Sequence, residues 1–219
     1  MKKFMFLLVS AAFLMAGAAQ ARSSGNLSIT PYVSIKNNKT IVPNVDTGEE
    51  EERIDERQEY GIRAALRMGK LFKFQMGLGQ SKSIKTEKAA RIKDTYDKID
   101  LQQELNISTD DPSKDIKITE TQNVGNASIV FDPSFSVFIA RVKLGITAMQ
   151  RIFEKEEEGL PSVRKEDGPN YFPHSGVGLG IKVTPRMFFI AEYEFIHYAY
   201  PPKAEPFERQ LTVSFGLQI

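Results

Sequence analysis

Residues 172–198 read FPHSGVGLGIKVTPRMFFIAEYEFIHY, and this stretch alternates apolar side chains with small or charged ones in two successive runs. In the first run, every second residue from Val177 to Val183 is apolar, and glycines or Lys182 stand between them. In the second run, apolar residues alternate with Glu192 and Glu194. Because successive side chains of a strand point to opposite faces, this period of two predicts two strands. The Thr184-Pro185 pair between the runs favours a tight antiparallel turn.

The same alternation recurs along the rest of the chain. It is found in residues 26–36, 58–68, 72–82, 123–131, 135–149, 172–183, 188–198 and 210–219. The last run sets Leu211, Val213, Phe215, Leu217 and Ile219 against small or polar residues. A strand of roughly ten residues is long enough for a tilted crossing of a bilayer core. The pattern predicts an all-β chain of eight strands.

The composition of the second face distinguishes a barrel from a soluble sandwich. That face carries mostly Gly, Ala, Ser, Thr and Gln, with a sparse set of Arg, Lys and Glu. A face open to bulk water would carry long charged side chains more evenly, whereas small residues suit a crowded, concave interior. The pattern favours a small barrel with its apolar face toward lipid.

The connections alternate in length. Short turns are predicted at residues 69–71, 132–134 and 184–187, and long connections at roughly 37–57, 83–122, 150–171 and 199–207. This order is typical of outer-membrane barrels, which have short periplasmic turns and long extracellular loops. The acidic runs Glu49–Glu52 and Glu154–Glu158 are interpreted as solvated loop segments, although either could hold a divalent cation. Residues 88–105 have near-helical spacing and could form a short helix or lack fixed structure.

The first 21 residues have the features of a secretory signal peptide. Lys2 and Lys3 precede the apolar stretch 4–19, and Ala19-Gln20-Ala21 supplies a cleavage pattern before Arg22. The predicted domains are therefore a cleaved signal peptide, residues 1–21, and a barrel domain, residues 22–219. No later apolar run approaches the length of a spanning helix, and the chain has no Cys to form disulfides. Its net charge of +1 argues against a nucleic-acid partner.

These features resemble the eight-stranded outer-membrane β-barrel family of OmpA- and OmpX-type barrels. The resemblance rests on the connection pattern, the strand around Gly176–Gly180, the strand Ala191–Phe195 and the C-terminal strand. It implies a single eight-stranded antiparallel up-and-down transmembrane barrel in the cell outer membrane. It also implies recognition of the C-terminal strand by the barrel-assembly machinery, although Ile219 stands where the family usually has an aromatic residue.

The barrel interior is expected to hold a network of charges. Every second residue of a strand points to the same face, and we call this inward or outward parity. The charged residues with inward parity are Glu59, Arg63, Arg67, Lys73, Arg141, Lys143, Lys182, Glu192, Glu194 and Glu208. Because an unpaired buried charge costs several kcal/mol, these groups should pair, with a modest surplus of cations. The expected function is an envelope or structural role with a plugged lumen. The alternative is a small anion-favouring pore, in which glycines on the inner face leave a thin wet path.

An enzymatic function is not expected. The stretch Glu194–Ala199 resembles the His-x-Ser segment of outer-membrane lipid A 3-O-deacylases, and His197 has the parity of a lipid-facing residue. Ala199 stands at the serine position, so the nucleophile for acyl transfer is missing. His197 is therefore interpreted as part of an interfacial aromatic belt with Tyr198, Tyr200 and Phe207, and His174 is placed at the rim. No cofactor or metal is expected; the expected partners are outer-membrane lipid and lipopolysaccharide, and the protein is expected to be a monomer.

Overall fold

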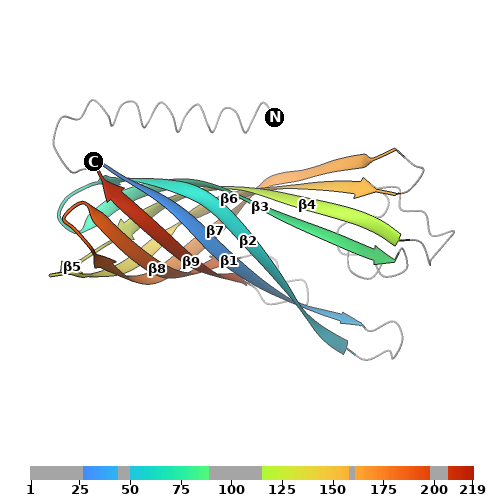
Figure 1. Ribbon diagram of the computed structural model, residues 1–219, viewed down its shortest axis with the longest axis horizontal. Helices are drawn as coiled ribbons and strands as arrows, with labels where there is room; N and C mark the ends of the chain where they lie inside the picture. The colour runs from blue at the N-terminus through green and yellow to red at the C-terminus, as the bar shows by residue number, and fades with distance from the viewer. Residues whose placement is uncertain (1–26, 44–49, 89–114, 158–160, 198–206) are drawn as a thin grey trace.

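The computed structural model describes residues 27–43, 50–88, 115–157, 161–197 and 207–219 (Figure 1). In these residues every regular element is a strand. The strands are β1 (Leu27–Pro43), β2 (Glu50–Arg67), β3 (Phe72–Lys88), β4 (Asp115–Phe131), β5 (Ser134–Phe135), β6 (Phe138–Glu156), β7 (Val163–Lys182), β8 (Met187–His197) and β9 (Phe207–Gln218). The predicted all-β fold is confirmed. None of the described segments forms a helix that is long and apolar enough to span a membrane.

The strands form one closed antiparallel barrel. Neighbours follow the order β4-β3-β2-β1-β9-β8-β7-β6, and pairing of β4 with β6 closes the sheet. The two-residue β5 lies in the turn before β6 and pairs with it. The last strand β9 pairs with both β1 and β8, so the first and last of the described strands are neighbours in the wall. Eight long strands therefore build the barrel, as the alternation predicts.

The strands are longer than the sequence pattern indicates. β1 continues to Pro43, and β2 begins at Glu50, inside the span 37–57 expected to be loop. In the same way β3, β4, β6 and β7 reach into the expected loops 83–122 and 150–171. Figure 1 shows these extensions leaving the barrel in separate groups, with the β1–β2 pair apart from β3 and β4. Most of the exposed side chains described on the extensions are polar, such as Lys117, Glu156 and Arg164, although Ile84 is 56% exposed. The hydrophobic alternation therefore weakens there while backbone pairing continues.

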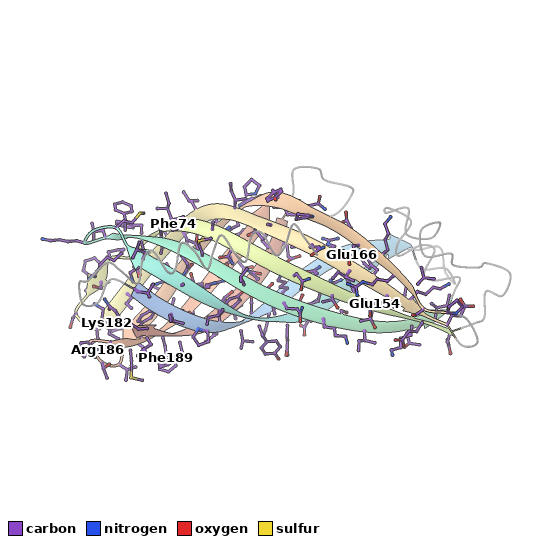
Figure 2. All side chains as sticks on the ribbon, turned by 90° about the horizontal axis from the view of Figure 1, so that it is seen from above. Phe74, Glu154, Glu166, Lys182, Arg186 and Phe189 are labelled. Carbon is purple, nitrogen blue, oxygen red and sulfur yellow. The ribbon has the colours of Figure 1, made fainter. Side chains whose placement is uncertain are left out.

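The two faces of the barrel wall differ as the pattern predicts. Leu144 and Leu179 on the outer face are 65% and 74% exposed, whereas Ser34 and Thr212 on the inner face are completely buried. Other exposed apolar side chains form a band around the wall near the short turns, and Phe74 and Phe189 belong to the same end (Figure 2). Since water-exposed apolar bands of this extent are unfavourable, the band is the surface that faces lipid.

The barrel has two distinct ends. Lys182 and Arg186 lie near the short turns, whereas Glu154 and Glu166 lie toward the opposite end (Figure 2). We call these the turn end and the loop end. The predicted signal peptide, most of the candidate helix 88–105, and Tyr198 and Tyr200 of the predicted belt lie outside the described residues.

Candidate functional site

The lumen contains most of the charges that parity places there. Seven of the ten residues have side chains that are nearly fully buried: Glu59, Arg63, Arg141, Lys143, Glu192, Glu194 and Glu208. Lys73 is partly buried, with 19% of its side chain exposed. Arg67 is exposed at the last residue of β2, where the strand leaves the wall, and Lys182 donates a hydrogen bond to Ser134 near the surface. These last two lie at the turn end rather than within the lumen.

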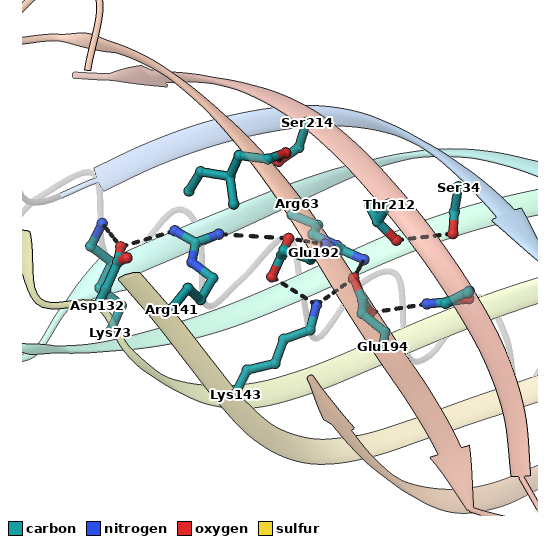
Figure 3. A network of polar contacts seen from close by, with 12 residues as sticks. Ser34, Arg63, Lys73, Asp132, Arg141, Lys143, Glu192, Glu194, Thr212 and Ser214 are labelled. Carbon is teal, nitrogen blue, oxygen red and sulfur yellow. Dashed lines mark hydrogen bonds and ion pairs between the residues drawn. The ribbon is translucent and has the colours of Figure 1, made fainter. Parts of the chain in front are cut away.

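The centre of the lumen is a cluster of two cations and two carboxylates (Figure 3). The Arg63 guanidinium donates to Glu192 and to Glu194, each at 2.8 Å. The Lys143 ammonium lies 2.7 Å from Glu194 and 3.3 Å from Glu192. Register explains the proximity, since Gly176 and Gly178 of β7 separate Lys143 and Arg141 of β6 from the two glutamates of β8. All four groups are oppositely paired, which offsets the cost of burying them.

The cluster continues toward the turn end through Asp132, which the sequence pattern did not identify. Its carboxylate accepts hydrogen bonds from Lys73 at 2.6 Å and from Arg141 at 2.9 Å. Arg141 also lies 3.7 Å from Glu192, so it links Asp132 to the central cluster. Asp132 begins the β4–β5 turn, and a turn residue has no strand parity from which its direction could be inferred.

A third group occupies the side of the lumen formed by β1, β2 and β9. Lys36 lies 2.7 Å from Glu59 and 3.3 Å from Glu208. The Tyr32 hydroxyl donates to Glu59 at 2.7 Å, and its ring lies 4.1 Å from the Arg63 guanidinium carbon, which joins this group to the central cluster. Lys36 and Tyr32 share the inward parity of Ser28, Thr30 and Ser34, so parity alone could have found both.

The ion-paired network is electrically balanced. Its cations are Lys36, Arg63, Lys73, Arg141 and Lys143, and its carboxylates are Glu59, Asp132, Glu192, Glu194 and Glu208. The expected cationic surplus is absent from this network. It came from counting Arg67 and Lys182, which lie at the turn end, and from omitting Asp132.

Several glycines on the inner face lie directly against large side chains. A Cβ at Gly79 would lie 2.3 Å from the Tyr32 hydroxyl, and one at Gly216 would lie 2.0 Å from the Phe188 ring. A Cβ at Gly77 would lie 2.9 Å from the Arg63 side chain. Real Cβ contacts are longer than this. A larger residue at any of these three positions would therefore clash with the side chain that lies against it.

Two clusters of apolar side chains also lie in the lumen. Toward the loop end, Val124, Met149 and Ile196 form a buried cluster with Phe172 packed against it. Ile196 lies opposite Glu208 in the β8–β9 register, so this level is apolar on one side and ion-paired on the other. At the turn end, Ile139, Phe188 and Ile190 form a second buried cluster, and the Lys73 ammonium lies 5.6 Å from the Phe188 ring.

The extension at the loop end carries ion pairs of its own. Arg57 donates to Glu120 at 2.5 Å across the space between β2 and β4. Burial raises the pKa of the Glu120 carboxyl, but the hydrogen bond and the charge of Arg57 lower it more, so this pKa lies below its ordinary value. Within the run Glu154–Glu158, expected to be a solvated loop, β6 continues to Glu156, and Lys155 pairs with Glu157 at 3.0 Å with both buried. Glu156 is exposed, and Glu158 lies outside the described residues. Glu50–Glu52 likewise begin β2 rather than forming loop.

His174 is not at the rim. It is 4% exposed, faces the lumen and lies 3.2 Å from the Thr147 hydroxyl through Nδ1. The reason is that β7 begins at Val163, eleven residues before His174, whereas the sequence pattern starts the strand near 172. His174 is therefore a polar residue of the lumen rather than of the rim.

His197 faces outward, and a serine that sequence spacing could not indicate lies beside it. The Nε2 atom of His197 lies 3.0 Å from the hydroxyl of Ser175 on the adjacent strand β7. Phe195 stacks on the imidazole, with ring centroids 6.5 Å apart. The partner is 22 positions away in the sequence and becomes a neighbour only through the β7–β8 pairing.

Comparisons with known proteins give a fold but no sequence family. No protein-family model and no curated protein matches the chain. The attachment invasion locus protein Ail of Yersinia pestis, solved with the heparin analogue sucrose octasulfate, is similar over 89% of this chain and 99% of its own, with a TM-score of 0.52 and 10% identity. Neisserial surface protein A is similar over 88% of this chain and 97% of its own, with a TM-score of 0.51 and 11% identity. The chain has the fold of the eight-stranded outer-membrane β-barrels.

The barrel fold and the apolar band together indicate where in the cell the protein is located. A closed barrel leaves no strand edge within the band, and the band is apolar on every long strand, which are the requirements for a wall embedded in lipid. The chain is therefore a protein of the bacterial outer membrane. No cluster of side chains suited to a metal ion occurs in the described residues.

Proposed function

We propose that this outer-membrane barrel is a non-enzymatic envelope protein whose lumen is closed to ions. The observation that carries the proposal is the continuous, charge-balanced network from Lys73 and Asp132 at the turn end to Lys36 and Glu208. Each charged group in it has an oppositely charged neighbour, so mobile counter-ions are not needed to neutralise the lumen.

Two further features support a plug over a pore. The glycines of the inner face are covered by Tyr32, Arg63 and Phe188, so they do not line an open path. Apolar clusters occupy the lumen on both sides of the central charges, and an apolar constriction opposes the entry of hydrated ions. An eight-stranded barrel is just wide enough for its own side chains to fill.

Conductance of the purified barrel tests the proposal. We expect planar bilayers containing the wild-type protein to show only rare, small current steps. Large, steady steps with weak selectivity would contradict the plug and make the protein a diffusion pore. Ail or another barrel of this size, purified and inserted in the same way, is a suitable control for insertion.

We infer the partners of this barrel from the surface and the strand pairing of its wall. Outer-membrane lipid and lipopolysaccharide would contact the apolar band and its polar upper edge. The barrel-assembly machinery would recognise β9, which carries the alternating apolar residues from Leu211 to Leu217, is followed by Ile219 and pairs with β1. We propose that the barrel acts as a monomer, since β4 and β6 close the wall within one chain.

One observation favours a second candidate, an esterase that acts from the outer wall. Ser175 and His197 form the contact that a serine nucleophile and its general base require. Against it, none of the described hydrogen bonds joins the other imidazole nitrogen to a carboxylate that would orient the ring. Ser175 lies opposite Leu144 of β6 and Phe195 of β8 in the register, so Ser175 and His197 also fit a polar pair on the outer wall that has no catalytic role.

Mass spectrometry of lipid A separates the two candidates. We expect lipid A from cells with and without this protein to have the same acyl chains, because no carboxylate among the described residues accepts a hydrogen bond from the imidazole of His197. Loss of one ester-linked acyl chain that is restored in both Ser175→Ala and His197→Ala variants would contradict this and assign the activity to the pair. Thr147→Val, inside the lumen beside His174, is the matched control for a hydroxyl–imidazole contact without lipid access.

A further inference from the structure

The barrel wall opens between β2 and β3 on the loop side of the apolar band. These strands pair from Arg67 and Lys73 only as far as Glu59 and Ser81. Beyond that point β2 continues to Glu50 paired with β1, and β3 continues to Lys88 paired with β4. The two strands therefore separate into a fork, which is the point where Figure 1 shows the β1–β2 pair leaving β3 and β4.

A hollow of about 490 Å³ lies at the base of this fork. Its walls are Ile35, Glu56, Arg57, Gln58, Tyr60, Gln80, Ser81 and Lys82. Gln58, Tyr60 and Gln80 occupy outward positions, whereas Arg57 and Ser81 occupy inward ones, so residues from both faces of the wall border the hollow. Its size is within the range of roughly 300–1,000 Å³ found for small-molecule sites.

The hollow has hydrogen-bonding groups of both kinds and an aromatic face. Tyr60 is 57% exposed, and its hydroxyl donates to Gln58 at 2.6 Å. The Gln80 amide donates to Asn123 at 2.7 Å, which leaves its carbonyl oxygen to accept. Ser81 is 2% exposed, and its hydroxyl has no hydrogen-bond partner in the part of the chain that is described. A buried hydroxyl without a partner is costly, and a ligand in the hollow would satisfy it.

The charges around the hollow do not favour a strongly anionic ligand. Arg57 is already paired with Glu120. Lys82 and Glu56 are both exposed and have opposite signs. What the hollow offers instead is amide, hydroxyl and ring surfaces, the combination that recognises a ligand with several hydroxyl groups and one apolar face.

We propose that the fork between β2 and β3 binds the sugar units of a glycolipid of the outer leaflet. Ile35 and Ile62 continue from the hollow into the apolar band and are 43% and 51% exposed, so the acyl chains of the same lipid would lie against them. A sugar headgroup joined to those chains would stand at the level of Gln58, Tyr60 and Gln80. This inference depends on the outer-membrane location and is independent of whether the lumen conducts.

Nuclear magnetic resonance of the full barrel in detergent micelles tests the proposal. The probes are lipopolysaccharide without its long polysaccharide, the core oligosaccharide released from it by mild acid, and inorganic phosphate. We expect the core oligosaccharide to shift the side-chain amide signals of Gln58 and Gln80 to saturation. Tyr60→Leu should weaken binding about tenfold, the equivalent of roughly 1.4 kcal/mol for one lost aromatic contact. Tyr171→Leu, a tyrosine 62% exposed on β7, is the matched control and should bind like wild type.

Other outcomes are equally decisive. Binding of the lipopolysaccharide alone, weakened by Tyr60→Leu, also supports the site and shows that it requires the sugar in its lipid-borne form. Equal displacement by inorganic phosphate would overturn the proposal in favour of an anion site. Shifts confined to the backbone amides of Lys82–Lys88 would overturn it in favour of strand addition at the open edge of β3. Absence of saturable shifts with both saccharide probes would overturn it as well.

Discussion

Replacing Glu192 and Glu194 together by glutamine should lower the free energy of unfolding by about 3–5 kcal/mol, the range measured when one partner of a buried ion pair is removed. Both side chains are almost completely buried in the lumen. Their loss leaves Arg63 and Lys143 facing each other with the same charge. Glutamine keeps the volume and one acceptor oxygen, so the effect reports charge rather than a cavity.

Urea titration of the barrel in lipid vesicles measures this change, and the heat-dependent shift of folded barrels on gels gives the folded fraction. The matched control is Glu154→Gln with Glu166→Gln. These carboxylates pair with Arg164 at the exposed loop end, at 3.4 and 2.9 Å. Because exposed ion pairs are worth at most about 1 kcal/mol, the control should unfold like wild type.

The same double variant links stability to closure of the lumen. Without the two carboxylates, the cations of the centre need mobile anions, so any residual conductance should rise and become more selective for anions. Unchanged stability together with unchanged conductance would show that the two glutamates are not partners of Arg63 and Lys143. That result would remove the observation on which the closed lumen rests.

The barrel was predictable because its outer face has to be apolar. Lipid requires an apolar residue at every second position, so runs such as Val177–Val183 and Leu211–Ile219 identify their strands and their facing without any knowledge of partners. Parity then predicts the inward direction of Arg63, Glu192 and Glu194. The alternation of turn lengths adds the up-and-down order.

The features that the sequence did not predict lie outside the lipid-facing part of the strands, where an apolar outer face is not required. Above the band the strands continue without an apolar outer face, and the burial of Lys155 and Glu157 has no signal in the outer-face pattern. Asp132 turns inward from a turn, where parity does not apply. Ser175 reaches His197 through strand pairing between distant positions. The fork between β2 and β3 depends on where pairing stops, which no local pattern records.

Placing a charge on the lipid face should produce the second large effect. Leu144 is 65% exposed in the middle of the outer face of β6, beside Ile129 of β4 and Ser175 of β7 in the register. Leu144→Arg should lower the free energy of unfolding in vesicles by about 2–4 kcal/mol, the cost of an arginine near the bilayer midplane. Leu144→Phe should fold like wild type, because it keeps the apolar surface.

Depth within the membrane is the variable that this experiment isolates. Gln150 has the same outward parity on β6, and its amide donates to Glu166 at the polar edge of the band. Gln150→Arg should therefore cost only about 0–1 kcal/mol, as expected near the interface. Equal losses for both arginine variants would mean that the membrane does not distinguish the two levels, and the placement of the band would be wrong. A large loss only at Leu144 locates the hydrocarbon core between the short turns and the fork, with the open part of the wall above it at the headgroups.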